Sequence, residues 1–271
     1  MLNFIATPIG NLNDISQRAI DAIRNCDYLY AEDTRVTKNL LNLYQIKKAC
    51  KSFHEHNEKK LTSSIVKHLL NNKNISIVSD AGTPGISDPG YNLIRECVDR
   101  NIKYTLIPGP SSVINGLIMS GLPTDKFCFY GFFPRKQNKI KESIELLKRE
   151  DKTSIFFESS KRMLKTLRYL EGSLQSERKI SICMEMTKIH ERVIRSNISN
   201  IISVIHKHKI SMKGEAVLVI DGISADKFKF TISPRVKYEY LEKLSAADAA
   251  KLISLITDEN KRDIYKSLIE N

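Results

Sequence analysis

The chain of 271 residues has no apolar run approaching the roughly 18–20 residues that a transmembrane helix needs. No basic segment followed by an apolar stretch is visible near Met1, so we expect neither a secretory signal nor a membrane partner. The five cysteines are scattered without a C-x-x-C pair, which argues against a zinc site and favours free thiols in a reducing compartment. These absences predict a cytoplasmic globular protein without a metal.

Two phosphate-binding motifs are also missing. The sequence contains no G-x-x-x-x-G-K-[ST] loop, and no G-x-G-x-x-G opens a helix after a predicted strand. The chain is therefore not expected to be an NTPase, a conventional NAD enzyme or a methyltransferase of the Rossmann type.

Short apolar runs alternate with helical patterns through residue 120. Strands are expected near 3–8, 28–32, 75–79 and 104–107, between helices near 15–25, 34–44, 59–71, 89–100 and 112–120. This alternation predicts a mostly parallel sheet covered by helices. Local signals predict two helix starts: a capping-box variant with Asp14 and Gln17, and Asp88 as the N-cap before Pro89.

A second α/β unit is expected after the turn-forming residues 121–124. Its strand candidates are 127–132, 154–157, 180–184 and 216–220, with helices near 139–149, 161–171 and 197–208. A mixed polar linker is predicted at 223–236, a helix from the Ser245–Asp248 capping-box variant to about Ile256, and a last helix near 260–269. We therefore expect three parts: an α/β domain at 1–123, a second at 124–224, and a linker with a helical tail at 225–271.

Three Gly/Pro-rich loops each follow a predicted strand, at 7–11, 79–90 and 107–112. Glycines let a backbone turn sharply and approach a ligand closely, and prolines hold the turn still. One such loop is as readily a structural turn. Three of them at the carboxyl edge of a parallel sheet favour a ligand cleft, because open α/β sheets bind ligands at that edge.

Six motifs carry a family resemblance: T-P-I-G-N-L at 7–12, A-E-D-T-R at 31–35, H-E-H-N-E at 54–58, S-D-A-G-T-P-G-I-S-D-P-G at 79–90, P-G-P-S-S at 108–112 and S-G-L-P-T-D at 120–125. In this order and spacing the chain resembles the ribosomal RNA small subunit methyltransferase I family, densely over residues 1–222 and more loosely beyond. The resemblance implies a tetrapyrrole-methylase type of α/β fold, with a donor cleft between two α/β domains and a small helix-turn-helix-like C-terminal appendage. It also implies 2′-O-methylation of a cytidine ribose in small-subunit (16S) rRNA, by a homodimer that acts on the rRNA or on the 30S subunit.

The cofactor that the resemblance implies is S-adenosylmethionine, as methyl donor, without a metal. Asp80 is the main donor-site candidate, because it directly follows the third strand as the acidic residue of the family's donor loop does. The full set of expected donor-binding residues is Pro8, Ile9, Asp80, Gly82, Thr83, Pro84, Ser111, Ser112, Phe157, Met184 and Ala216. Judged by residue type alone, Phe157 and Met184 are more often core residues than ligand contacts.

The acceptor side is predicted from polar motifs. Candidates for catalysis are Glu158, Lys188 and Glu55, and candidates for substrate binding are Arg35, His54, His56, Asn57, Lys161 and Arg162. Two of them have a structural alternative: Arg35 either clamps a phosphate or pairs with Asp33, and Lys188 either serves the site or pairs locally with Glu185.

Two departures from the family pattern bear on proton transfer. The family's Y-E-S-P-H-R reads F-E-S-S-K-R here, so Ser160 and Lys161 replace its proline and histidine. Its R-E-L-T-K reads M-E-M-T-K, without the arginine. A role in proton transfer for the histidine or the arginine of the family motifs is therefore excluded in this chain.

The net charge of +12 lies mostly in one part of the sequence. Residues 126–225 contain 20 Lys/Arg and 11 Asp/Glu, a net charge of +9. A folded basic face that follows a phosphate backbone fits this distribution better than a basic tail does. Lys251, Lys261, Arg262 and Lys266 of the tail are further candidates for RNA contact, and a plain packing role for the tail is an equal alternative. Two alternatives stay open: a methyltransferase of the same fold acting on a small molecule such as a tetrapyrrole, and a non-catalytic RNA-binding ribosome assembly factor.

Overall fold

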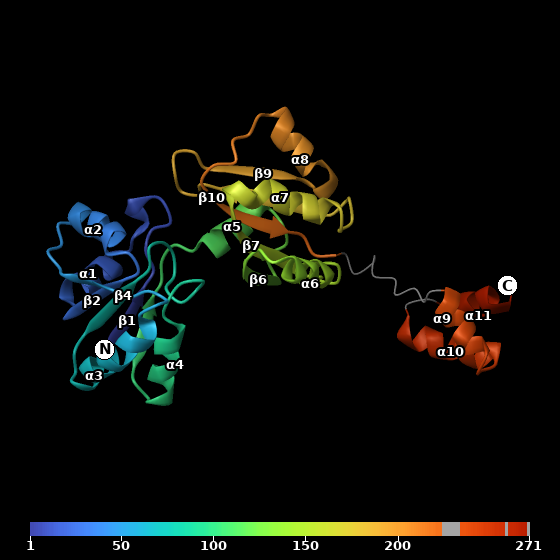
Figure 1. Ribbon diagram of the computed structural model, residues 1–271, viewed down its shortest axis with the longest axis horizontal. Helices are drawn as coiled ribbons and strands as arrows, with labels where there is room; N and C mark the ends of the chain where they lie inside the picture. The colour runs from blue at the N-terminus through green and yellow to red at the C-terminus, as the bar shows by residue number, and fades with distance from the viewer. Residues whose placement is uncertain (224–233, 258–259, 270–271) are drawn as a thin grey trace. The chain divides into compact units, whose positions relative to one another are not determined.

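The computed structural model describes residues 1–223, 234–257 and 260–269, which form two compact units, Met1–Gly222 and Ile223–Asn271 (Figure 1). The predicted boundary at 123/124 lies inside the first unit, and most of the predicted linker, 224–233, lies outside the described residues. No helix in the described part of the chain has the length and apolar character needed to cross a membrane.

The first unit contains two five-stranded sheets, and one of them is entirely parallel, in the order β3-β2-β4-β1-β5. Its strands are β1 (Leu2–Ile5), β2 (Tyr28–Ala31), β3 (Cys50–Ser52), β4 (Ile75–Val78) and β5 (Tyr104–Ile107). The connecting helices are η1 (Leu12–Asp14), α1 (Gln17–Asn25), α2 (Thr34–Leu43), α3 (Glu58–Leu70) and α4 (Tyr91–Asp99). The predicted parallel sheet is confirmed.

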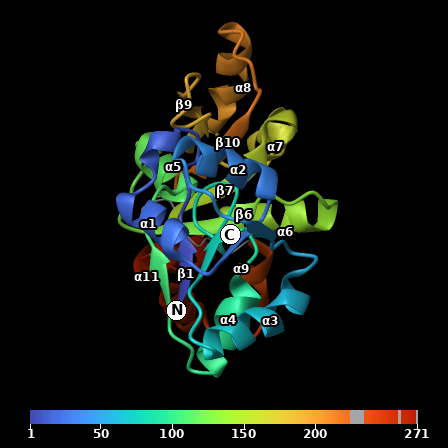
Figure 2. The ribbon, with the colours of Figure 1, turned by 90° about the vertical axis from the view of Figure 1, so that its left-hand side faces the viewer.

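Side chains of this sheet alternate between two apolar layers, as the period of a strand requires. Leu2 and Phe4 of β1 pack with α3 and α4 on one face, whereas Ile5 packs with α1 and α2 on the other. Figure 1 shows the two helix pairs on opposite faces, and both views place α3 beside α4 (Figure 2). Because helices cover both faces, β4 is buried along its whole length.

One predicted helix start is wrong. Asp14 does not cap α1, because it ends η1; the N-cap is Ser16, whose hydroxyl accepts a hydrogen bond from the Ala19 N–H at 3.2 Å.

The second sheet is mixed, in the order β6-β7-β10-β8-β9, with β6 parallel to β7 and the other pairs antiparallel. Its strands are β6 (Phe127–Phe132), β7 (Thr153–Ser159), β8 (Lys179–Met184), β9 (Arg192–Asn197) and β10 (Glu215–Ile220). One face packs against α6 (Gln137–Leu147), α7 (Ser160–Glu171) and α8 (Ile198–Lys207) around a core that includes Phe156, Ile182 and Leu218.

Helix α5 (Ser112–Ser120) joins the two sheets. It begins after β5 of the first sheet and covers the free face of the second, where Val113 and Leu117 pack with Val217 and Val219 (Figure 1). Its last turn is held by the Ser181 hydroxyl, which donates to the Ser120 carbonyl at 3.0 Å. Gly116 lets α5 approach β10 closely, since a Cβ there would lie only 2.8 and 3.1 Å from carbon atoms of Val217.

We expect Gly116→Ala to lower the free energy of unfolding by about 1–2 kcal/mol. Overpacking a core costs ~1–3 kcal/mol, which outweighs the ~1 kcal/mol of helix propensity that alanine adds. Gly172→Ala is the matched control, because a Cβ at that exposed end of α7 would have its nearest neighbour at 3.5 Å. Urea denaturation of both variants checks the prediction, and equal stability of the two would contradict it.

The second unit consists of α9 (Pro234–Leu241), α10 (Ala246–Ile256) and α11 (Lys261–Ile269). Ser245 caps α10 by accepting from the Asp248 N–H at 3.2 Å and donates to the Asp248 carboxylate at 2.6 Å, so the predicted cap is confirmed. Ala249, Ile253 and Ile264 form part of a small core between α10 and α11. The predicted linker extended to residue 236, but α9 begins at Pro234, a residue type favoured in the first helical turn.

Candidate functional site

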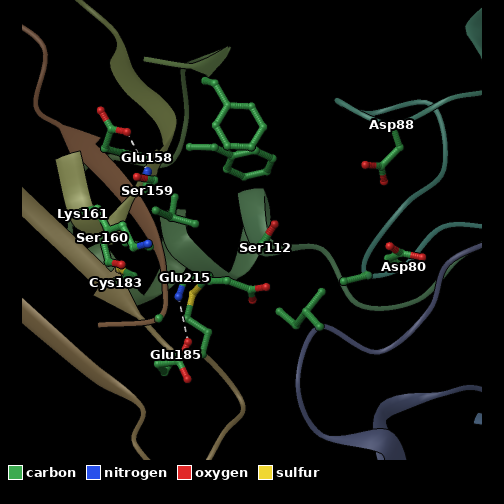
Figure 3. A pocket seen from close by; sticks show the side chains of 18 of the residues that line it. Asp80, Asp88, Ser112, Glu158, Ser159, Ser160, Lys161, Cys183, Glu185 and Glu215 are labelled. Carbon is green, nitrogen blue, oxygen red and sulfur yellow. Dashed lines mark hydrogen bonds between the residues drawn. The ribbon is translucent and has the colours of Figure 1, made fainter. Parts of the chain in front are cut away.

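A cavity of about 480 Å³ opens between the two sheets of the first unit, within the size range of small-molecule sites. Loops that follow β1, β2, β4 and β5 contribute Ile9, Glu32, Asp80, Ala81, Asp88 and Ser112. The second sheet, its loops and the first turn of α7 contribute Phe132, Phe157, Glu158, Ser159, Ser160, Lys161, Cys183, Glu185, Met186, Gly214, Glu215, Ala216 and Val217. Figure 3 shows Asp80 and Asp88 on one side of the cavity, facing the residues of the second sheet.

The loop at 79–90 is held in a fixed shape at the cavity edge. Thr7 and Gly82 exchange two backbone hydrogen bonds of 2.9 and 3.0 Å, which join this loop to the one after β1. Gly82 and Gly90 have φ values of 79° and 136°, which only glycine adopts readily. Ser87 is also left-handed, with φ 62°, directly before Asp88. Strained backbone of this kind is concentrated at functional sites.

The helix after this loop is capped by a distant carboxylate, so the predicted role of Asp88 is wrong. The N-cap of α4 is Gly90. The buried Glu58 of α3 accepts hydrogen bonds from the N–H groups of Gly90 and Asn92 at 3.1 and 3.0 Å, and from the Asn92 side chain at 2.9 Å. Asp88 is thereby left free of capping and lines the cavity.

Three carboxyl groups lie close together in the loops that follow β2 and β4: those of Glu32, Asp80 and Asp88. Asp80 accepts a hydrogen bond from the Asp33 N–H at 2.8 Å, which ties the two strand ends together. Burial and the neighbouring charges of Glu32 and Asp80 raise the pKa of Asp88 from its ordinary 3.8 to about 7. Burial and Asp80 also raise the pKa of Glu32. This side of the cavity therefore suits a cationic ligand and a group that gives up a proton near neutral pH.

Glu158 is held from several directions on the opposite side of the cavity. Its side chain is 1% exposed and accepts hydrogen bonds from Arg162 at 2.8 Å, the Thr166 hydroxyl at 2.6 Å and the Ser159 N–H at 2.6 Å. Arg162 also donates to the Phe133 carbonyl at 2.6 Å. This arrangement shapes the turn from β7 into α7 and leaves Glu158 little freedom to exchange partners.

Lys188 is held by ion pairs with two glutamates. Its ammonium is 3.1 Å from the Glu185 carboxylate and 3.0 Å from that of Glu215, so the local pair expected at Glu185 is present. Glu185 also accepts from the Glu215 N–H at 2.8 Å, and these contacts lower the pKa of Glu185. The following turn reaches the first sheet, where the Asn11 N–H donates to the Thr187 hydroxyl at 3.0 Å.

The predicted site residues divide between the cavity wall and its surroundings. The wall contains Ile9, Asp80, Ser112, Phe157, Glu158, Lys161 and Ala216. The loops and strands around it contain Pro8, Gly82, Thr83, Pro84, Ser111, Met184 and Lys188, and helix α7 contains Arg162. Ser111 caps α5 by accepting from the Ile114 N–H at 3.5 Å, and Met184 is fully buried in the core of the second sheet. Its neighbour Met186 lines the cavity instead.

The remaining candidates lie at the ends of β2 and β3. Arg35 is 88% exposed and pairs with Asp33 at 2.6 Å, which lowers the pKa of Asp33 to about 2. Asn57 accepts from the His54 N–H at 2.8 Å and closes a turn in which Glu55 and His56 are exposed. The buried Nδ1 of His54 has no hydrogen-bond partner among the described residues.

Twelve of the nineteen cavity residues were absent from the sequence-based set, among them the carboxylates Glu32 and Asp88. Glu32 directly follows β2 as Asp80 follows β4, so the same strand-end signal could have selected it. Asp88 was assigned to a helix cap. In the described ranges, no cluster of three His, Cys, Asp or Glu side chains could hold a metal ion.

Comparison with known proteins gives consistent similarities. Residues 1–202 match the family described as Tetrapyrrole (Corrin/Porphyrin) Methylases. The chain is similar to proteins named Ribosomal RNA small subunit methyltransferase I. The one from Haemophilus influenzae is 39% identical over 98% of this chain and 95% of that protein. The one from Thermotoga maritima is 44% identical over 82% of this chain and 98% of that protein, a length close to that of the first unit alone.

Solved structures support the same fold. A uroporphyrin-III-C-methyltransferase from Thermus thermophilus matches with a TM-score of 0.57 at 14% identity, covering 81% of this chain and 93% of that one. A diphthine synthase matches with a TM-score of 0.61 at 16% identity, covering 81% of this chain and 89% of that one. The expected tetrapyrrole-methylase type of fold is confirmed.

Proposed function

The chain belongs to the ribosomal RNA small subunit methyltransferase I family, and we propose that it moves a methyl group from S-adenosylmethionine to the 2′-oxygen of a cytidine ribose in small-subunit rRNA. The cavity between the two sheets is the proposed site. The observation that carries the proposal is that Asp80 and Asp88 lie on one side of a cavity whose lining on the second sheet includes the apolar Phe157, Ala216 and Val217.

The residues of the cavity fit the donor's chemistry. S-adenosylmethionine supplies a methyl group already activated by a positively charged sulfur. Asp80 offers a negative charge to the cationic part, and Phe157 and Ala216 offer apolar surface to the adenine ring. Ser112 at the start of α5 adds a hydroxyl. Because the methyl group needs little further activation, the protein contributes mainly placement of the two substrates, an effect that lowers barriers by ~7–11 kcal/mol.

A basic stripe at the cavity edge suits the phosphates of an RNA acceptor. Lys161, Lys165 and Arg168 follow one another at i, i+4 and i+7 on α7, so they share one face of the helix, and all three are exposed. Lys161 lines the cavity, and Lys165 lies over the Tyr169 ring at 6.0 Å. Within the described part of the chain, none of the three forms an ion pair. The stripe begins at the proposed transfer site with Lys161 and continues along α7, which belongs to the most basic part of the sequence, residues 126–225.

We expect the triple charge reversal Lys161→Glu, Lys165→Glu and Arg168→Glu to weaken RNA binding at every salt concentration. Each lost phosphate contact should flatten the slope of log affinity against log salt by roughly 0.7–0.9, or about 2–3 for the set. Donor affinity, measured by calorimetry, should change far less than RNA affinity. An unchanged salt slope would contradict a role of this stripe in RNA binding. Arg162 is left intact, because its pair with the buried Glu158 makes it a structural residue.

The proposal includes a cellular location, an oligomeric state and further RNA contacts in the second unit. A cytoplasmic location follows from an rRNA substrate, and the homodimer implied by the family resemblance is testable by light scattering. The exposed Lys251, Lys261, Arg262 and Lys266 of the second unit are proposed as further RNA contacts. The Thermotoga maritima relative, whose match is close in length to the first unit, suggests that such contacts add to a site contained in residues 1–222.

Methyl transfer from radiolabelled S-adenosylmethionine tests the proposal. The acceptors offered side by side are 30S subunits, protein-free 16S rRNA and a uroporphyrinoid. We expect label in one or both RNA substrates and none in the tetrapyrrole. Label in the tetrapyrrole alone would support a small-molecule methyltransferase, and RNA binding without donor binding or transfer would support an assembly factor.

A further inference from the structure

Methyl transfer to a hydroxyl group requires a place for a proton. In the proposed reaction the O–H bond breaks and an O–CH3 bond forms, while the S–CH3 bond breaks and its electron pair stays on sulfur. The proton must leave as the oxygen attacks, because a neutral hydroxyl is a weak nucleophile. The family motifs of this chain lack the histidine and the arginine noted above, so neither serves here.

We propose that the carboxylate of Asp88 takes the proton from the acceptor hydroxyl and then releases it to solvent. The inference rests on the proposed function and assigns one residue a role in it. Its basis is the geometry of the loop at 79–90, which places this carboxyl on the cavity wall beside Asp80 (Figure 3).

Asp88 can accept a proton because Glu58, and not Asp88, binds the N–H groups at the start of α4. An aspartate before proline at a helix start normally binds the first N–H groups of that helix. Here Glu58 takes the N–H groups of Gly90 and Asn92, at 3.1 and 3.0 Å. The left-handed backbone of Ser87 belongs to the same turn. A buried carboxylate brought from α3 and a strained loop thus combine to keep Asp88 in the cavity rather than at the helix.

The other acidic residues of the cavity wall have fixed partners. Asp80 holds the Asp33 N–H, and Glu32 accepts from the backbone N–H of Asp80. Glu158 is enclosed by Arg162 and Thr166. The two remaining glutamates, Glu185 and Glu215, share Lys188. Protonation would weaken these contacts, because it removes the negative charge that holds each partner. In the described part of the chain, by contrast, the one hydrogen-bonding group beside the Asp88 carboxyl is the Ser79 hydroxyl.

The surroundings of Asp88 also make it a stronger base than an ordinary aspartate. Burial is the largest cause of its raised pKa, and the carboxyls of Glu32 and Asp80 at the ends of β2 and β4 add to it. The Ser79 hydroxyl acts in the opposite sense. His54, from the end of β3, interacts electrostatically with Glu32, and Lys161 belongs to the opposite wall. A base with a pKa of about 7 is best matched to proton transfer near neutral pH.

The test compares Asp88→Asn, Asp88→Glu and wild type by initial rates of label transfer to 30S subunits between pH 5.5 and 8.5. For wild type, kcat/KM for the donor should fall tenfold per pH unit below about 7 and level off above it, because only the ionised carboxyl accepts a proton. Asp88→Asn should lose roughly 100- to 10,000-fold in rate, with no acid limb, while donor affinity by calorimetry stays within about fivefold. Asp88→Glu should keep an acid limb at a reduced rate. Asp99→Asn, at the exposed end of α4, is the matched control and should behave as wild type.

A second readout shows whether the asparagine variant is folded. The pKa of Asp88 is about 7 in the folded chain and 3.8 in the unfolded chain. Between these values the carboxyl is charged mainly in the unfolded chain, so the free energy of unfolding falls as the pH rises and stays lower at pH 8. Asparagine carries no such charge, and the Tm of Asp88→Asn at pH 8 should equal or exceed that of wild type.

Each contrary result has its own meaning. A rate above a third of wild type in Asp88→Asn, or an unchanged acid limb, overturns the role of Asp88 and leaves the proposed function standing. Loss of donor binding in step with the rate also overturns it, since Asp88 would then bind the donor. A wild-type chain that labels no RNA at any pH overturns the proposed function and this role with it.

Discussion

Asp80→Ala is expected to weaken the binding of S-adenosylmethionine by roughly 10- to 100-fold, because hydrogen bonds to a charged group contribute ~1.5–3 kcal/mol and each 1.4 kcal/mol is a factor of ten. Asp80 stands at the carboxyl end of β4, where an open α/β sheet binds its ligand. It also holds the Asp33 N–H at 2.8 Å, so its loss releases the end of β2 as well. Calorimetric titration of the donor measures the effect directly.

The controls separate a local effect from loss of the fold. Asp99→Ala removes an exposed aspartate of α4 and should leave donor affinity unchanged. Asp80→Asn keeps an oxygen for the Asp33 N–H but not the charge, so an intermediate affinity is expected. Donor affinity in Asp80→Ala within threefold of wild type would remove Asp80 from the donor site.

Glu58→Ala should lower the free energy of unfolding by about 3 kcal/mol, the largest stability effect that we expect from a single polar residue. The truncation leaves buried N–H groups at the start of α4 without an acceptor, each at a cost of ~1–3 kcal/mol, and it removes a negative charge from a helix N-terminus. Urea denaturation with circular dichroism provides the value.

Glu171→Ala is the matched control, since Glu171 is an exposed glutamate at the end of α7. Its effect should stay within about 0.5 kcal/mol. A loss below about 1 kcal/mol in Glu58→Ala would show that Glu58 does not hold α4 and the loop at 79–90 in place.

The strands and helices of the first unit were largely predictable because each buried strand is a short apolar run. β5 was expected at the residues where it lies, and β4 one residue longer. The two strands that the sequence did not reveal, β3 (Cys50–Ser52) and β9 (Arg192–Asn197), lie at sheet edges. β3 is only three residues long, and β9 has just two adjacent apolar residues, so neither shows a pattern of period two.

The cavity was predictable from strand ends, but the roles of its carboxylates were not. Topology alone brings Ile9, Asp80 and Ser112 to one edge of a parallel sheet, which is why the loops pointed to them. Asp88 looked like a helix cap because the local pattern of aspartate and proline is typical of one. Glu58, thirty residues earlier, displaces it through a tertiary contact that no local pattern contains.

Fixed partners are equally invisible in a sequence. Glu158 and Lys188 were expected to serve the chemistry because their motifs are polar and lie at strand ends. The structure surrounds Glu158 with Arg162 and Thr166, and places Lys188 between two glutamates. Spacing predicted the Glu185 pair, since i and i+3 neighbours meet in a turn, whereas the Glu215 contact joins residues 27 positions apart.

The most direct test of the account is the nucleoside composition of RNA methylated by this chain. After reaction of 30S subunits with isotopically labelled S-adenosylmethionine, the rRNA is digested to nucleosides and the labelled product identified by mass spectrometry. The account predicts one labelled species, 2′-O-methylcytidine, because the proposed reaction transfers the methyl group to the 2′-oxygen of a cytidine ribose and not to a base. Label on a base, or on no nucleoside while the donor binds, would contradict it.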